Sequence, residues 1–152
     1  MAKAHKQCTA EELLEMLATR VVIRGEALDN VNPRKANAQF EIMVKLSCEL
    51  LRRGVSEHPK ILSMLENKNP YVKKWAAFLA FEIDPLRAER VLEEISRNYP
   101  RDLNLGFSAG FTLELWRKGE LRTISSWGCK KVIELGRRVP TEPNGRGKDD
   151  RR

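Results

Sequence analysis

The placement of proline constrains the fold of this chain more than any other feature. Five of its seven prolines stand at or just before the first turn of a segment with helical apolar spacing: Pro33, Pro59, Pro70, Pro85 and Pro100. Proline is tolerated there because the first-turn amide has no partner within the helix and the fixed φ suits a helix start. No proline interrupts such a segment. The sequence therefore predicts an all-α chain.

Apolar residues three and four apart, together with capping signals, predict six helices. Thr9 and Glu12 have the spacing of a capping box at the start of the first helix. Asp84 and Asp102 stand where helix N-caps are expected, so we interpret them as caps and not as paired catalytic acids. The expected ranges are about 10–28, 33–53, 58–67, 70–83, 85–98 and 102–118.

The helix expected over residues 70–83 is apolar on nearly all sides. One side carries Val72 and Leu79, and the opposite side carries Trp75 and Phe78. A helix without a polar face has to be covered on two sides. We therefore expect this helix in the middle of the fold, with Trp75 in the core. The alternative, in which the aromatic row is a stacking platform for nucleic-acid bases, stays open.

Two of the helix starts resemble each other at a spacing typical of helical repeats. Asn32-Pro33 and Asn69-Pro70 lie 37 residues apart, and periods near 40 are characteristic of two-helix solenoid repeats. We expect a short right-handed stack of about three antiparallel helix pairs, closed by a capping segment over 119–138. The expected division of the chain is a flexible N-terminal arm, a single helical domain and a disordered tail, at residues 1–8, 9–138 and 139–152.

The net charge of +7 does not concentrate in the expected domain. Residues 1–8 carry +2 and residues 134–152 carry +2, which leaves only +3 for residues 9–133. Acidic and basic residues alternate in segments such as 87–97, a pattern typical of a solvated helix face. A duplex-binding surface concentrates its cations on one face. The charge pattern therefore favours a protein partner over nucleic acid.

Apolar run length and cysteine usage bear on the compartment. The apolar runs fall short of the ~20 residues that a membrane span needs, and the N-terminus lacks the apolar stretch of a secretory signal. We therefore expect a soluble cytoplasmic protein without a membrane partner. Cys8, Cys48 and Cys129 are odd in number and far apart, so we expect reduced thiols, with Cys48 an inert small residue of the core.

An enzyme is not expected from these residues. The only histidines, His5 and His58, lie in the expected arm and at a helix start, where neither a histidine-based triad nor a zinc site is favoured. Gly106 and Gly110 lie within an expected helix, so their spacing favours close helix packing over phosphate binding. No catalytic residue, cofactor or metal is therefore predicted.

Several segments resemble a known family. The stretch from Asn69 to Ala77 resembles the second-helix start of HEAT repeats, and the wider run over about residues 10–121 resembles a small bacterial HEAT-like family called domain of unknown function twenty-nineteen. The resemblance implies a compact HEAT-like helical domain without an assigned activity. Small helical proteins of this sort often act as immunity or inhibitor proteins for a cognate partner. The matching segments are Arg34–Asn37, Glu49–Gly54, Asn69–Ala77, Glu82–Pro85 with Ala88, and Leu113–Leu121.

Two function classes follow from these expectations. The first is a non-catalytic protein-binding module with a concave surface made by second helices, and its candidate partner-binding residues are Arg34, Asn37, Lys73, Lys74, Trp116 and Arg117. The second is nucleic-acid binding or processing, with phosphate and base contacts from Lys73, Lys74, Trp116, Arg117 and Lys118. Each of these side chains also has a purely structural interpretation, as a helix-end cation or a core tryptophan.

Overall fold

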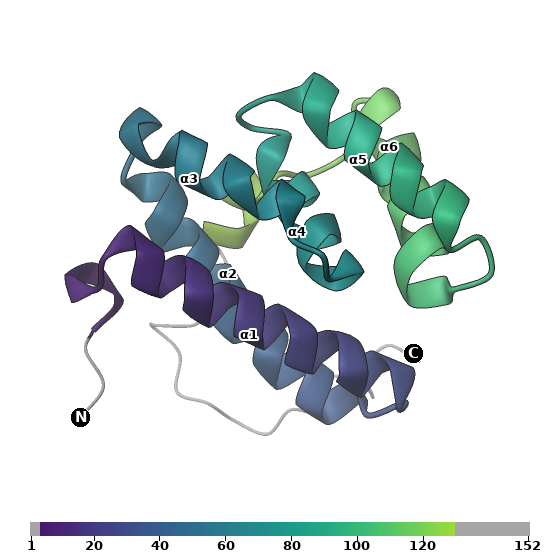
Figure 1. Cartoon of the computed structure of the whole chain (residues 1–152), viewed down its shortest axis with the longest axis horizontal. Helices are drawn as coiled ribbons and strands as arrows, with labels where there is room; N and C mark the ends of the chain where they lie inside the picture. Colours follow the sequence, from purple (N-terminus) through teal and green to yellow (C-terminus); the bar gives the residue numbers. More distant parts are fainter. Residues whose placement is uncertain (1–3, 130–152) are drawn as a thin grey trace, which may run out of the picture.

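The computed structural model describes residues 4–129, and within this range the chain is helical without a β-strand (Figure 1). The α-helices are α1 (Ala10–Asp29), α2 (Pro33–Arg52), α3 (His58–Ser63), α4 (Pro70–Ala80), α5 (Pro85–Asn98) and α6 (Ser108–Arg117). Short 3-10 or π turns are η1 (His5–Gln7), η2 (Val55–Glu57), η3 (Met64–Glu66), η4 (Leu103–Phe107) and η5 (Ile124–Gly128). The predicted all-α class is confirmed. No helix within residues 4–129 is long and apolar enough to cross a lipid bilayer.

The helix starts follow the capping residues that the sequence predicts. The Glu12 amide donates a hydrogen bond to Thr9 Oγ1 and the Thr9 amide donates one to the Glu12 carboxylate, which confirms the capping box. Asn69 and Asp84 cap α4 and α5, each immediately before a proline, and Asp102 caps η4. Such caps satisfy amides that a helix leaves unpaired at its N-terminus, so these starts are determined locally.

Helix α4 lies between the α1–α2 pair and α5. Helices α1 and α2 form an antiparallel pair, and α4, α5 and α6 lie above it (Figure 1). Trp75 on α4 is only 8% exposed, and its Nε1 donates a hydrogen bond of 3.0 Å to Oγ of the fully buried Ser47 on α2. The predicted core position of α4 is confirmed. Trp75 and Phe81 are buried and Tyr71 and Phe78 are partly buried, so the aromatic row offers no continuous exposed platform for stacking bases.

The sixth helix differs from the continuous helix that the sequence predicts over 102–118. It begins with the π turn η4 and becomes α-helical only at Ser108. An added Cβ at Gly106 would lie 1.9 Å from the carbonyl oxygen of Tyr99, far inside van der Waals contact. The η4 backbone therefore approaches the preceding loop more closely than a side chain permits. Apolar periodicity carries no signal for such a contact.

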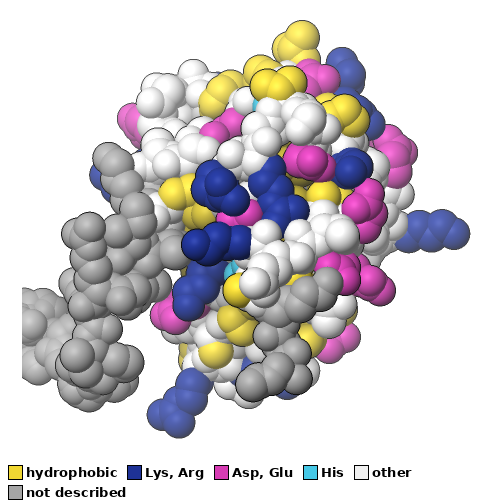
Figure 2. Space-filling view, turned by 90° about the vertical axis from the view of Figure 1, so that its left-hand side faces the viewer, with side chains coloured by type: hydrophobic (Ala, Val, Ile, Leu, Met, Phe, Trp, Pro, Cys, Tyr) yellow, Lys and Arg dark blue, Asp and Glu magenta, His cyan; other side chains and the backbone are white. Residues whose placement is uncertain are grey.

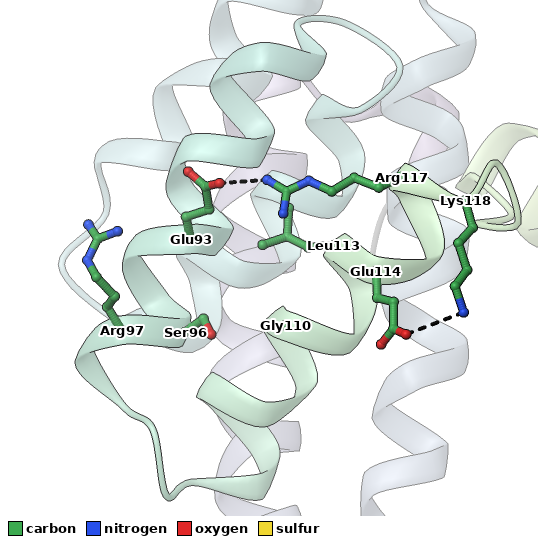
Figure 3. A pocket seen from close by; sticks show the side chains of 8 residues that line it. All are labelled: Glu93, Ser96, Arg97, Gly110, Leu113, Glu114, Arg117 and Lys118. Atoms are coloured by element: carbon green, nitrogen blue, oxygen red, sulfur yellow. Dashed lines mark hydrogen bonds and ion pairs between the residues drawn. The ribbon is translucent and has the colours of Figure 1, made fainter.

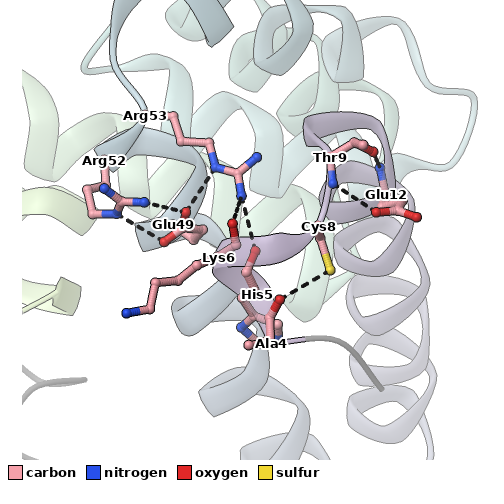
Figure 4. A network of polar contacts seen from close by, with 9 residues as sticks. All are labelled: Ala4, His5, Lys6, Cys8, Thr9, Glu12, Glu49, Arg52 and Arg53. Carbon is pink, nitrogen blue, oxygen red and sulfur yellow. Dashed lines mark hydrogen bonds and ion pairs between the residues drawn. The ribbon is translucent and has the colours of Figure 1, made fainter. Parts of the chain in front are cut away.

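The N-terminal arm expected at residues 1–8 is folded where the structure describes it. The turn η1 packs against α2, and Cys8 is buried. The Arg53 side chain, which bonds Glu49 at 2.9 Å, donates hydrogen bonds to the backbone oxygens of His5 and Lys6 (Figure 4). Residues 5–8 are thus held by packing and hydrogen bonds, where the sequence predicted flexibility, because α2 supplies distant donors for their carbonyls.

The capping segment predicted at 119–138 is only partly within the described residues. It passes from α6 through residues without regular structure to the π turn η5, which packs on α2. Its remainder at 130–138, and the tail predicted at 139–152, lie outside the described residues.

The cysteines do not match the prediction of reduced thiols. Cys48 on α2 and Cys129 after η5 form a disulfide, with Cα atoms 5.6 Å apart, whereas Cys8 is a free buried thiol. Cys48 is therefore not an inert core residue. The paired cysteines are 81 positions apart in the sequence, and the packing of η5 on α2 brings them together. Cysteine spacing alone could not indicate that packing.

Replacing Gly106 with alanine should destabilise the fold, because the new methyl group would overlap the Tyr99 carbonyl oxygen. We expect the free energy of unfolding, measured by urea denaturation, to fall by about 2–4 kcal/mol. Gly110→Ala is the matched control, since its Cβ would lie 3.4 Å from Ser96 Oγ and alanine is favoured in a helix by ~1 kcal/mol. Equal stability of the two variants would contradict the close approach at Gly106.

Candidate functional site

A hollow of about 360 Å³ lies where the α1–α2 pair meets α4 and the η4–α6 segment. Its lining comes from α1, α2, α4, α5 and the η4–α6 segment. We call it the basic hollow, because both of its charged side chains are cationic. The lining residues are Arg24, Leu28, Phe40, Lys74, Trp75, Phe78, Leu92, Leu103, Asn104, Ser108 and Thr112.

Lys74 is fixed in the basic hollow by two hydrogen bonds. Its Nζ donates to the backbone oxygen of Asn104 at 2.6 Å and to Ser108 Oγ at 2.9 Å, which links α4 to the η4–α6 segment. Burial, and to a smaller extent the Arg24 cation, lowers the pKa of Lys74 to about 8, against the opposing effect of Asp102. An ammonium group has three N–H donors, so one is left for a further acceptor.

Arg24 is a half-buried cation without a carboxylate partner among residues 4–129. Its Nε is buried without a hydrogen-bond acceptor in the described part of the chain, and its guanidinium carbon lies 5.0 Å from the centre of the Phe40 ring. Burial also lowers the pKa of Arg24. Buried charges are nearly always paired, because desolvating an isolated charge is costly. A cation–π contact offsets only ~1 kcal/mol of that cost, so an incoming anion would stabilise Arg24.

Three aromatic rings form an apolar wall of the basic hollow. Phe40 and Trp75 meet edge to face with ring centres 5.8 Å apart, and the Phe78 ring lies 5.3 Å from that of Trp75. Such pairs restrict each other's orientation. The basic hollow thus combines a hydrogen-bonded cation, an unpaired cation and an ordered aromatic surface. That combination suits an anion that carries an apolar group.

Asp29 connects three elements beside the basic hollow. Its Oδ1 accepts a hydrogen bond of 2.6 Å from the Tyr71 hydroxyl and one of 3.1 Å from Asn104 Nδ2. Burial and the bond to Asp29 raise the pKa of Tyr71 well above its ordinary range, so this hydroxyl remains a donor. The end of α1, the start of α4 and η4 are therefore joined at one carboxylate.

An exposed apolar row borders the basic hollow. The exposed fractions are 71% for Leu103, 62% for Phe107 and 53% for Phe111, although large apolar side chains are usually buried. Each stands one position before a residue that lines the hollow, namely Asn104, Ser108 and Thr112. The two rows are therefore neighbours along the η4–α6 segment. We call the three exposed side chains the apolar ridge.

The structure does not bring the predicted partner-binding residues together. Lys74 lines the basic hollow, and Lys73 is partly buried on the same helix. Arg34 and Asn37 are exposed near the start of α2 and line neither the hollow nor the ridge.

Trp116 and Arg117, the other two predicted residues, belong to a network that joins α6 to α5. The Trp116 ring stacks on Phe81 with centres 4.4 Å apart, and its Nε1 donates to Glu89 at 3.0 Å. The Arg117 guanidinium donates to Glu89 at 3.1 Å and to Glu93 at 2.6 Å. Both side chains are thus engaged within the domain.

Paired charges distinguish other surfaces from the basic hollow. In a groove between α5 and α6, Arg117 pairs with Glu93 and Lys118 pairs with Glu114 (Figure 3). The face shown in Figure 2 carries interspersed acidic and basic side chains, with several cations gathered at its centre. Since neither Arg24 nor Lys74 forms an ion pair with a carboxylate within residues 4–129, we take the hollow and the adjoining ridge as the candidate site.

Neither Arg24 nor Phe40 is among the site residues that the sequence predicts. A signal for Arg24 was present, because it lies three residues after Val21 and four before Leu28, on the inward stripe of the first helix. A charged residue in register with an apolar stripe indicates a buried charge. The apolar ridge has no equivalent signal, since its helical spacing is that of core residues.

Comparison with family profiles and with curated proteins finds no match to this chain. Among solved structures, the chain is similar to the protein RPA1889 from Rhodopseudomonas palustris CGA009, which is known from a crystal structure. The two proteins share 26% sequence identity, and the likeness covers 80% of this chain and 98% of that chain with a TM-score of 0.71. The likeness supports the all-α fold.

The Lys74 environment predicts a pH-dependent stability. Its folded-state pKa of about 8 lies below its ordinary value of 10.5, so between these values the unfolded chain binds the extra proton. Burial of the charged Lys74 side chain therefore lowers the free energy of unfolding at lower pH, and this loss is recovered as the pH rises. Relative to Lys74→Met, the free energy of unfolding of the wild type should increase by about 2 kcal/mol from pH 7.5 to 10 in urea denaturation. A constant difference would contradict the burial of this charge.

Proposed function

We propose that this chain is a non-catalytic protein-binding module that receives a segment of its partner on the apolar ridge and the basic hollow. The observation that carries the proposal is the exposure of Leu103, Phe107 and Phe111 beside a half-buried cation that lacks a carboxylate. Exposed apolar groups next to a pocket commonly mark interaction sites. Anchoring side chains in such sites dominate the binding energy.

In this proposal the domain is a short HEAT-like stack of helix pairs. Support comes from the packing of α1 on α2, of α4 on α5 and of α5 on α6, and from the convergence of all five of these helices at the basic hollow. Membership of the family called domain of unknown function twenty-nineteen, and a cytoplasmic role as an immunity or inhibitor protein, belong to the same proposal. A role as an immunity or inhibitor protein would make the partner a single cognate protein.

The chemistry of the site defines the partner segment. Ridge residues that are four positions apart can pack between apolar side chains at helical spacing on an amphipathic helix. The cations of the basic hollow favour a partner with an acidic residue in the same segment, because complementary charge adds specificity. We therefore expect a segment that combines apolar residues with Asp or Glu.

The nucleic-acid alternative stays a prediction that no observation favours over protein binding. Of its expected contacts, Arg117 pairs with Glu93, Lys118 pairs with Glu114, and Lys74 is hydrogen-bonded in the basic hollow. Titration of labelled DNA and RNA at low salt tests it. Binding that weakens steeply as salt rises would favour this alternative.

A phage-displayed peptide library should yield binders that combine apolar residues three or four apart with an acidic residue. Changing Phe107→Gln and Phe111→Gln together should weaken these peptides by roughly tenfold or more, because the peptide loses its apolar contacts. Fluorescence polarisation of labelled peptides measures the affinities.

Leu86→Gln is the matched control for the ridge variant. Leu86 is 68% exposed on α5 and is not part of the ridge, so its replacement should leave the affinities unchanged. Circular dichroism verifies that both variants keep the helical fold. A library without binders, or peptides that bind the ridge variant as tightly as the wild type, would overturn the ridge as a docking surface.

A further inference from the structure

We propose that the basic hollow is an anion site that holds a carboxylate between Arg24 and Lys74, with an aromatic group attached to that carboxylate packed on the Phe40–Trp75 wall. This inference rests on the proposed function in one respect, which is that the carboxylate belongs to the partner segment docked on the ridge. The anion site itself can be tested without any partner.

The two cations of the basic hollow favour the binding of an anion. Lys74 offers one free N–H, and Arg24 offers a guanidinium whose Nε is buried without an acceptor. The two charges are close enough that Arg24 disfavours the charged form of Lys74. A bound carboxylate would reverse this repulsion and accept hydrogen bonds from both groups. Such charge-assisted bonds are among the stronger ones in proteins.

The size and lining of the hollow favour a carboxylate over a phosphate. A phosphate group has three acceptor oxygens and nearly two negative charges, and it is usually held by several donors. Among the lining side chains, only Arg24 and Lys74 are charged, and the remainder is mostly aromatic or aliphatic. Because Asp102 offsets part of the positive charge at Lys74, a monovalent anion matches the hollow better than a phosphate, and an aromatic group matches its wall.

The route into the hollow is continuous with the apolar ridge. Leu103 belongs to the ridge and also lines the basic hollow. A peptide segment lying on the ridge could therefore place an acidic residue and a neighbouring aromatic residue into the hollow. This continuity makes the partner segment the source of the carboxylate that we favour over a free aromatic acid.

Phenylacetate is the minimal probe, and phenylacetamide is its neutral counterpart. In ¹H–¹⁵N correlation spectra of the full chain, phenylacetate should shift the amide signals of Lys74 and Ser108 with a dissociation constant on the order of 1–10 mM, as expected for so few atoms. Phenylacetamide should bind roughly tenfold more weakly or not at all. Raising the pH from 7 to 9 should weaken phenylacetate binding, since Lys74, which is flanked by Arg24 and Asp102, then loses its proton.

Arg24→Gln tests the site directly, with Arg90→Gln as the matched control. Arg90 is exposed on α5 and does not line the hollow. Phenylacetate should bind Arg24→Gln roughly tenfold more weakly and Arg90→Gln as tightly as the wild type. Thermal unfolding shows whether each variant is folded, and if Arg24→Gln fails to fold, Lys74→Gln replaces it. Equal binding of acid and amide, or phenylacetate affinity unchanged in the folded hollow variant, would overturn the anion site.

A second experiment distinguishes a carboxylate of the partner segment from that of a free aromatic acid. Display-selected peptides are compared with versions in which each Asp or Glu is changed to its amide. If the amide versions bind the wild type more weakly than the acidic peptides do, but bind Arg24→Gln equally well, the partner segment is supported as the source of the carboxylate. Phenylacetate binding without such acid dependence would overturn the partner as the source and leave a site for a free acid. Acid binding with no ridge-binding peptide at all would overturn the proposed function while the anion site stands.

Discussion

The hydrogen bond from Trp75 Nε1 to Ser47 Oγ fixes how α4 lies against α2. A buried indole N–H without an acceptor would cost about 1–3 kcal/mol, so this bond favours one register of the two helices over others. In that register the Trp75 ring meets Phe40, and the neighbouring Lys74 reaches Asn104 and Ser108. One buried polar pair thereby positions both the aromatic wall and the fixed cation of the candidate site.

The fold divides into parts that local sequence determines and parts that it does not. Thr9, Asn69 and Asp84 act on amides within three residues of themselves, so the helix starts could be predicted from short segments. The π turn η4 depends on contact between Gly106 and Tyr99, and the disulfide joins residues 81 positions apart. Features of this second kind arise from tertiary contacts, which periodicity and capping patterns do not encode.

The candidate site shows the same division. Lys74 could be predicted because a basic residue stands out on an apolar helix, but its acceptors come from residues 30 and 34 positions later. Trp116 and Arg117 were predicted as partner contacts because nothing in the sequence indicates that Glu89 approaches them from another helix. Arg24 has no carboxylate partner within residues 4–129. The sequence could not indicate this, because ion pairing depends on which residues the fold brings together.

The shared carboxylate of Asp29 has a consequence for the thermodynamics of recognition. It joins the end of α1, the start of α4 and η4 through Tyr71 and Asn104, so these bonds favour one separation of the three elements before a ligand binds. The conformational freedom that a loosely tethered pocket would give up on closing is already lost during folding. A guest would therefore meet a preorganised receptor, and little of its intrinsic affinity would be consumed by rearrangement of the host.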